Sequence, residues 1–183
     1  QTTVIENTEI GDIDYAPRAL EYYATAIESM VDLPAIRAAA PKVFTGYGHG
    51  AVSFIMPNLL AKLGAEVLAI NPFASASGAT RFDRDRNASV VADLVTSSGS
   101  VLGLMFSPGG EQLSVIDDAG RLLTHRQLLL ALIAMRGDSL EGSRVALPVS
   151  VTQHATAMVE SRNGSVVLTP TSGAEIMAAA SDP

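Results

Sequence analysis

The sequence predicts a fold of the α/β class, a three-layer αβα arrangement around a mixed, mostly parallel sheet, followed by a partial second copy of the same unit. Strand-like apolar runs alternate with segments of helical periodicity, which is the order of βαβ units with parallel strands. Two strand-like runs, over residues 101–106 and 113–116, are separated by only six residues. Because a parallel crossover needs a dozen residues or more, these two strands are expected to form a hairpin.

The first 41 residues are predicted to form an acidic segment that contains a helix. Residues 1–32 carry seven acidic side chains against a single basic one, Arg18, so most of the formal net charge of −7 arises here. Apolar residues recur at helical spacing over residues 15–31, with Asp14 as the expected N-cap and Pro17 in the first turn. We interpret the acidic side chains as a solvated helix face.

The first βαβ unit is predicted over residues 43–70. A strand over residues 43–45 leads into a glycine-rich turn, and an apolar-periodic helical segment follows it. Gly64 is expected to end that helix in the left-handed conformation, before a strand over residues 66–70. The connection implies two parallel strands joined by a right-handed crossover.

A polar stretch over residues 71–86 is predicted to be a loop. Asn87 is the expected N-cap of a short helix over residues 88–97, and Gly99 is the expected residue that ends it. This helix leads into the hairpin.

A leucine-rich helix over residues 125–136 follows the hairpin. Thr124 and Gln127 have the spacing of a capping box, which predicts the start of this helix. Gly137 is expected to end it. We assign residues 1–137 to the first domain, within which residues 1–41 are the N-terminal acidic segment and helix.

A second strand–helix–strand pattern follows, and we assign residues 138–183 to the start of a second domain. The distance from the first strand to the helix-ending glycine is about 21 residues in the first unit and about 19 in the second, which indicates a duplicated unit. Because this copy stops after one βαβα, we expect its domain to continue beyond this chain. Its expected elements are a strand over 144–149, a helix from Gln153 with Thr152 as N-cap, a strand over 165–168, and a last helix opened by Ser172 and Glu175.

The composition excludes several kinds of site and partner. The chain has no cysteine, which excludes disulfides, cysteine-ligated zinc, iron–sulfur clusters and thiol nucleophiles, and fits a reducing, cytoplasmic setting. The acidic balance argues against a nucleic-acid partner, which needs a basic face, and no apolar run is long enough to span a membrane. The three histidines, His49, His125 and His154, lack metal-ligand spacing, and no G-x-S-x-G pattern marks a nucleophilic serine.

The glycine-rich turn has more than one interpretation. The run from Gly46 to Ala51 matches the pattern G-x-G-x-x-A, in which glycines let backbone amides approach a pyrophosphate at a helix N-terminus. Against a dinucleotide site, the acidic residue expected after the second strand is replaced by Asn71, and Pro57 interrupts the helix. A structural turn, or a turn that faces a phosphosugar, explains the pattern better. The residues that would face the phosphosugar are Gly48, His49 and Gly50.

Five runs, over residues 29–32, 42–51, 60–67, 103–106 and 113–120, carry a family resemblance through their order and spacing. Together they resemble the α-D-phosphohexomutases, the phosphomannomutase and phosphoglucomutase family, over its second domain and the start of its third. The last two runs are similar to the family pattern lGiAfDgDaDRlavvDe.G. The resemblance implies a phosphohexomutase fold, an isomerase activity by intramolecular phosphoryl transfer, and a place in sugar-phosphate or nucleotide-sugar metabolism.

The hairpin loop departs from the family pattern at its metal-binding positions. In the family a D-G-D-x-D-R loop supplies three aspartates to Mg²⁺ and places an arginine beside the phosphoserine. The corresponding residues here are Ser107, Gly109, Glu111 and Gln112. One carboxylate is not expected to hold Mg²⁺, and phosphoryl transfer depends on that charge. We therefore predict a vestigial metal loop, no bound cofactor and no catalytic residue in this chain.

Three hypotheses about function remain. The first is a catalytically degenerate phosphohexomutase-like module with a structural, regulatory or sugar-phosphate-binding role, whose partners are a sugar phosphate and other domains of the same full-length chain. Proteins that resemble a fusion of mannose-1-phosphate guanylyltransferase with a phosphomannomutase-like region contain such modules. The second is an active phosphomannomutase with a displaced metal site built from Glu111 and from Asp117 or Asp118. The third is a dinucleotide-binding module.

Overall fold

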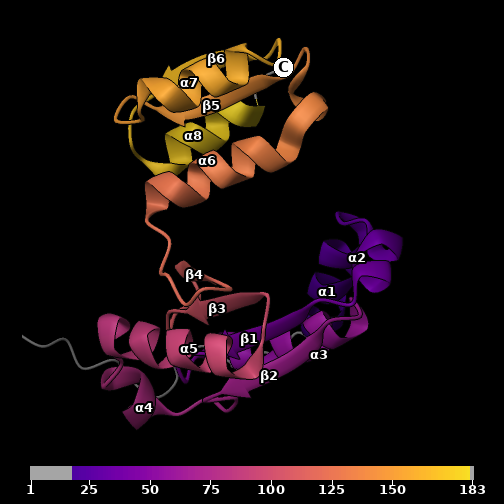
Figure 1. Ribbon diagram of the computed structural model, residues 1–183, viewed down its shortest axis with the longest axis vertical. Coiled ribbons are helices and arrows are strands. Elements are labelled where there is room, and N and C mark those ends of the chain that lie inside the picture. The colour runs from indigo at the N-terminus through magenta and orange to yellow at the C-terminus, as the bar shows by residue number, and fades with distance from the viewer. Residues whose placement is uncertain (1–17, 182–183) are drawn as a thin grey trace, which may run out of the picture.

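Two sheets organise the chain in the computed structural model, which describes residues 18–181 (Figure 1). The larger sheet has four strands in the order β2–β1–β3–β4, and the smaller sheet pairs β5 with β6. The strands are β1 (Lys42–Gly46), β2 (Glu66–Ile70), β3 (Leu102–Phe106), β4 (Leu113–Asp117), β5 (Arg144–Pro148) and β6 (Ser165–Thr169).

The larger sheet is mixed. β1 pairs in parallel with β2 on one side and with β3 on the other, and β3 pairs with β4 in antiparallel orientation. In the hairpin, Leu102 lies opposite Asp117 and Phe106 lies opposite Leu113. The predicted mixed, mostly parallel sheet with a hairpin at one edge is therefore confirmed.

Helices cover both faces of the larger sheet. On one face α5 (Arg84–Ser98) buries Val91 and Val95 against Phe44 and Ile116. On the other side α1 (Ala19–Ser29), α2 (Leu33–Ala39) and α3 (Met56–Lys62) share a second apolar cluster. The buried members of that cluster are Ala24, Leu59 and Leu63. This arrangement confirms the predicted three-layer αβα class.

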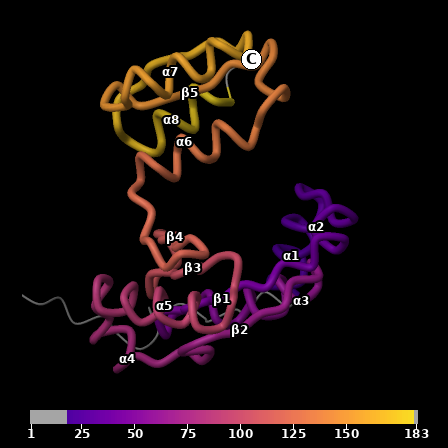
Figure 2. The backbone as a smooth tube through the Cα atoms, in the orientation of Figure 1, coloured from indigo at the N-terminus to yellow at the C-terminus, as the bar shows by residue number. Residues whose placement is uncertain are grey.

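The smaller sheet lies in a second helical lobe with α6 (His125–Arg136), η3 (Gly137–Leu140), α7 (Gln153–Glu160) and α8 (Gly173–Ser181) (Figure 1). Its buried core consists of Ile133, Leu140, Leu147, Ala155 and Val159. The backbone trace shows a stretch without helix between β4 and α6 (Figure 2). Because α6 contributes Ile133 to this core and packs against α7, the packing favours a boundary between β4 and α6 over one after Gly137. The division into two domains stays a prediction.

The N-terminal helix is shorter than predicted. Its expected start at residue 15, with Asp14 as N-cap, lies outside the described residues, and α1 ends at Ser29. A separate helix, α2, follows and was missed. The carboxylate of Asp32 accepts a hydrogen bond from the backbone N–H of Ala35 at 3.0 Å, and Pro34 stands in the first turn. A new cap and a proline thus start a second helix where the apolar periodicity predicted none.

The helical segment after the glycine turn is divided, contrary to the prediction. A 3₁₀ helix, η2 (Ala51–Phe54), comes first, and α3 begins at Met56 with Pro57 in its first turn. Pro57 fits in the first turn of α3 because a backbone N–H at that position would have no partner within the helix. Gly64 follows α3 with φ 92°, as predicted.

The stretch expected to be a loop over residues 71–86 contains α4 (Ala76–Thr80) and the start of α5. The N-cap of α5 is Asp83 and not Asn87, because the Asp83 carboxylate accepts a hydrogen bond from the N–H of Arg86 at 3.0 Å. Gly99 ends α5 with φ 66°, as predicted. The capping box of Thr124 and Gln127 at the start of α6 is confirmed.

Candidate functional site

The carboxyl ends of β1 and β3 bring together the glycine turn and the hairpin loop. Gly46 lies opposite Met105 in the parallel ladder, so the residues after each strand emerge at the same edge of the sheet. A Cβ atom on Gly48, where φ is 56°, would lie 2.6 Å from the carbonyl oxygen of Phe106, and one on Gly50 would overlap the carbonyl group of Pro108. These two glycines are required by the close approach of the hairpin backbone.

His49 packs against α4. Its half-buried ring lies so close to Gly78 that a Cβ atom on that residue would be 2.7 Å from the ring atom Nδ1. The carbonyl oxygen of His49 accepts a hydrogen bond from the N–H of Ser75 at 2.9 Å. The structure therefore brings Gly48, His49 and Gly50 together in one turn, with contacts from α4 and the hairpin loop. Their exposure to a phosphosugar stays a prediction.

Tyr47 is fully buried beneath this edge. Its ring stacks on Phe106 with 6.0 Å between ring centroids and 12° between planes. Its hydroxyl has no hydrogen-bonding partner among the described residues. Burial raises the pKa of the Tyr47 phenol, and the neighbouring Thr45 hydroxyl offsets this only in part. The aromatic stack fixes the two strand ends relative to each other.

The hairpin loop is closed by its own hydrogen bonds. The N–H of Ser107 donates to the carbonyl of Gln112 at 3.0 Å, and the N–H of Gln112 donates to the Ser107 hydroxyl at 3.1 Å. That hydroxyl donates in turn to Oε2 of Glu111 at 3.3 Å, and the N–H of Gly110 donates to the Ser107 carbonyl at 2.9 Å. The four sequence-predicted residues of the vestigial loop, Ser107, Gly109, Glu111 and Gln112, thus lie in one turn.

These residues do not fit Mg²⁺. Glu111 is the loop's single carboxylate, and it is engaged with Ser107. Between residues 18 and 181, no three side chains of His, Cys, Asp or Glu gather as a set of metal ligands. Mg²⁺ demands near-octahedral oxygen coordination and is held through carboxylates together with waters and substrate phosphates. The donor set here offers too little anionic oxygen.

The structure argues against a displaced metal site that joins Glu111 to Asp117. Glu111 precedes β4 and Asp117 ends it, so the length of the strand, about 13 Å at 3.4 Å per residue, separates them. The carboxylate of Asp117 also has partners of its own. It accepts hydrogen bonds from the backbone N–H groups of Ala119 and Arg121, and from the guanidinium group of Arg121. The backbone hydrogen bond from Arg121 makes the largest contribution to lowering the pKa of Asp117.

The glycine turn does not have the geometry of a dinucleotide fingerprint. It opens on the short 3₁₀ helix η2, and α3 starts only at Met56. The N–H of Gly50 donates to the Tyr47 carbonyl at 3.0 Å, and the hairpin backbone fills the space beside Gly50. The pattern G-x-G-x-x-A is explained by the close approach of two backbones, and the structure argues against the dinucleotide hypothesis.

A smaller hollow lies on the α5 face of the same edge of the sheet. It has a volume of about 240 Å³ and is lined by Phe82, Arg84, Met105, Ser107, Gln112 and Ser114. We refer to it as the Arg84 hollow. Two of its residues, Ser107 and Gln112, belong to the predicted loop, whereas sequence reasoning missed Arg84 and Ser114. The available signal was Ser114 itself, a polar residue inside the otherwise apolar run of the predicted strand.

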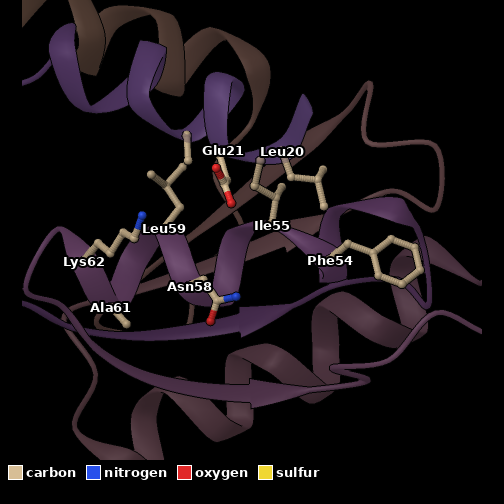
Figure 3. A pocket seen from close by; sticks show the side chains of 9 residues that line it. Leu20, Glu21, Phe54, Ile55, Asn58, Leu59, Ala61 and Lys62 are labelled. Atoms are coloured by element: carbon tan, nitrogen blue, oxygen red, sulfur yellow. The ribbon is translucent and has the colours of Figure 1, made fainter. Parts of the chain in front are cut away.

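A larger hollow of about 390 Å³ lies between α1 and the segment formed by η2 and α3 (Figure 3). Leu20 and Glu21 of α1 face Phe54, Ile55 and Leu59 across it. Its lining is mostly apolar, and it lies apart from the residues singled out in the sequence.

None of the helices described between residues 18 and 181 has the length and apolar character needed to cross a membrane.

By sequence, the chain is similar to phosphoglucosamine mutases. It is 28% identical over 149 residues to that of Aeromonas hydrophila, covering 77% of this chain and 32% of the relative. It is 25% identical over 154 residues to that of Edwardsiella ictaluri, covering 81% of this chain and 34% of the relative. The chain thus spans about a third of the length of these curated relatives. No family model matches it.

Solved structures share the fold. A phosphoglucomutase/phosphomannomutase family protein from Burkholderia thailandensis matches 87% of this chain with a TM-score of 0.72 and 18% identity, over 34% of its own chain. A phosphomannomutase-like structure from Thermus thermophilus matches 83% of this chain with a TM-score of 0.68 and 18% identity, over 36% of its own chain. The likeness shows a shared fold over most of this chain.

Proposed function

We propose that this chain contains a domain of the α-D-phosphohexomutase family, and that this domain serves a hexose-phosphate protein without binding the Mg²⁺ that phosphoryl transfer uses. The hairpin loop is the observation that carries this proposal. Its single carboxylate accepts a hydrogen bond from Ser107, and the Ser107 hydroxyl accepts one from the N–H of Gln112. Its role is therefore structural or that of binding a sugar phosphate.

The proposed ligand is a hexose phosphate or a hexosamine phosphate. The curated relatives are named for phosphoglucosamine, and the solved structures for phosphoglucomutase and phosphomannomutase. All of these names denote transfer of a phosphoryl group on a six-carbon sugar. The other domains of the full-length protein are its proposed partners. Fusion to a nucleotidyltransferase, a role in nucleotide-sugar synthesis and a cytoplasmic location stay predictions.

The chemistry that Mg²⁺ supplies is neutralisation of the charge that develops on the transferred phosphoryl group. No residue of the loop replaces that charge, since Gln112 is neutral and Glu111 is itself an anion. The loop's own contribution is to fix the end of β3 against the glycine turn. We therefore expect no Mg²⁺-dependent turnover from this domain.

The test is Mg²⁺ titration of the full-length protein by calorimetry and thermal shift. A quadruple variant, Ser107→Asp, Gly109→Asp, Glu111→Asp and Gln112→Arg, introduces the three aspartates and the arginine of the family pattern and should bind Mg²⁺ at least about ten-fold more tightly than the natural chain, because three carboxylates then converge. The matched control replaces the first three residues by Asn, which has the same shape without the charge. It should gain no affinity.

Turnover is the second readout. The natural full-length protein, given a bisphosphate primer and Mg²⁺, should interconvert neither the 1- and 6-phosphates of glucosamine nor those of mannose or glucose. Mg²⁺-dependent interconversion that disappears in Glu111→Ala would overturn the proposal and favour an active mutase.

A further inference from the structure

The helix α1 is apolar on its outer face as well as on the face that packs on α3. Ala24 of the inner face is buried together with Leu59 and Leu63 of α3. The opposite face carries five uncharged side chains at helical spacing, which we call the α1 stripe: Ala19, Tyr22, Tyr23, Ala26 and Met30. A helix with apolar side chains on both faces is normally covered on both.

The large side chains of the α1 stripe are exposed. Tyr22 is 66% exposed, Tyr23 is 54% exposed and Met30 is 80% exposed. Together they present about 400 Å² of mostly apolar surface, a size at which a patch on a monomer is often an interaction site. Figure 1 shows α1 and α2 at one end of the larger lobe.

None of the five residues of the α1 stripe is charged. The two acidic residues of α1 have partners of their own, since Glu21 accepts a hydrogen bond from Nε of Arg18 at 2.7 Å and Glu28 lies 3.5 Å from Nζ of Lys62. In a symmetric pair every residue of the interface is present twice, so a charged stripe would repel its own copy. An uncharged stripe can pack on a second copy of itself.

The small and large residues of the α1 stripe complement each other when two copies of the helix lie antiparallel. A two-fold axis that crosses α1 between residues 24 and 25 is equally far from Ala19 and Met30, and equally far from Tyr23 and Ala26. Each large side chain then lies against a small one of the second copy, as interlocking helix surfaces require. A parallel symmetric pair would place each tyrosine against its own copy.

The two ends of α1 favour the same orientation. Arg18 precedes the helix, and its guanidinium carbon lies 5.9 Å from the ring centroid of Tyr22. Described from Ala19 to Ser29, α1 has no basic residue in its last turn, so the negative end of its dipole is not offset within the helix. Antiparallel pairing brings Arg18 of each copy to the C-terminal end of the other copy's α1, where a cation is favourable.

We propose that the α1 stripe is a self-association surface through which two copies of this protein form an antiparallel helix pair. About 400 Å² from each copy gives about 800 Å² in total, less than the roughly 1,200–2,000 Å² of stable complexes. The dimer is therefore weak, with a dissociation constant of roughly 10 µM to 1 mM. None of the residues involved belongs to the hairpin loop or the glycine turn, so pairing needs neither a sugar phosphate nor Mg²⁺.

The test is sedimentation equilibrium of the full-length protein at concentrations from about 1 µM to 500 µM, which span a weak monomer–dimer equilibrium. Tyr23→Glu should weaken association at least about ten-fold, because one substitution buries two like charges in a symmetric pair. Phe73→Glu is the matched control, since Phe73 is 79% exposed outside the stripe, and it should associate as the natural protein does. Both side chains are exposed in the single copy, so neither variant should change the thermal unfolding of the monomer.

Disulfide cross-linking determines the orientation of the two helices. The 183 residues contain no cysteine, so a cysteine introduced into α1 is identified directly by mass spectrometry of the cross-linked peptides. Mixing Tyr23→Cys protein with Ala26→Cys protein should give the cross-linked dimer under mild oxidation. Mixing Ala19→Cys protein with Tyr23→Cys protein should give much less, because antiparallel pairing displaces these positions by about 10 Å along the helix axis.

Three outcomes overturn the assignment: a monomer at every concentration, a dimer that Tyr23→Glu leaves intact, or preferential cross-linking of the Ala19→Cys and Tyr23→Cys pair. A monomer in which α1 is protected from hydrogen exchange at every concentration would assign the stripe to another part of the same full-length chain. All of these measurements are made without ligand or metal, so their outcome is independent of whether Mg²⁺ binds or turnover occurs.

Discussion

The two strand–helix–strand units of the chain have the same backbone pattern and differ in what lies beside their first turn. β1–α3–β2 and β5–α7–β6 each pair two five-residue parallel strands. Counted from the first residue of each unit, Lys42 and Arg144, Gly50 of the first turn corresponds to Thr152 of the second. The glycines are therefore not a property of the strand–helix–strand unit itself.

The neighbouring hairpin accounts for the difference. β1 has β3 beside it, and the loop after β3 contacts the glycine turn, whereas β5 has only β6 as a neighbour among residues 18–181. The residue after the strand shows the same contrast: Tyr47 is 0% exposed and Val149 is 63% exposed. A sequence pattern typical of nucleotide binding thus arises here from the packing of one loop against another.

The largest change in the free energy of unfolding is expected at the first of the two matched turn positions, Gly50 and Thr152. Gly50→Ala should lower the free energy of unfolding by about 3 kcal/mol, because the added Cβ overlaps the Pro108 carbonyl and the backbone must move. Thr152→Ala should change it by less than about 0.5 kcal/mol, since the Thr152 hydroxyl is buried without a partner and caps no helix N–H. Urea denaturation measures both. Similar losses in the two variants would contradict the comparison.

A smaller loss of stability is expected from substitutions in the two apolar cores, one against each sheet. Val91 and Val159 are each fully buried in separate apolar clusters. Replacing either by Ala should cost about 2 kcal/mol from lost burial and the cavity left behind. If the two lobes unfold separately, Val91→Ala accelerates hydrogen exchange in β1 and β3 alone, and Val159→Ala in β5 and β6 alone. Acceleration in all four strands by either variant would show one cooperative unit.

The smallest effect distinguishes Tyr47 from the exposed tyrosines. Tyr47→Phe should raise the free energy of unfolding at pH 7 by about 1 kcal/mol, because it removes a buried hydroxyl without a partner. Burial raises the pKa of the phenol above its ordinary value of 10.0, so the unfolded state loses its proton first and stability falls as pH rises above about 10. Tyr47→Phe should lessen that fall, whereas Tyr22→Phe, at an exposed position, should leave it unchanged. Denaturant titrations at pH 7 and pH 10.5 measure both.

Local signals predicted most of the elements. The hairpin follows from six residues between strands, and the end of α3 from Gly64 with its positive φ. The capping box at the start of α6 was also predicted, from the spacing of Thr124 and Gln127. One error concerned a choice between two N-caps: Asp83 and Asn87 are both good capping residues, and the Asp83 carboxylate accepts the capping hydrogen bond.

The candidate site was predicted only in part. The hairpin loop was identified from the residues that replace aspartates in the family pattern, and the structure places all four in one turn. Arg84 could not be associated with Ser114 from the sequence, because thirty residues separate them.

The sequence by itself determined the class of fold, the order of the strands and helices, and the loss of the aspartates from the hairpin loop, because periodicity, capping residues and loop length act over a few neighbouring residues. The tertiary structure decided why the glycines are needed and which side chains distant in the sequence contact one another. Both depend on close approach between segments distant in the chain: Gly50 against Pro108, and Arg84 against Ser114.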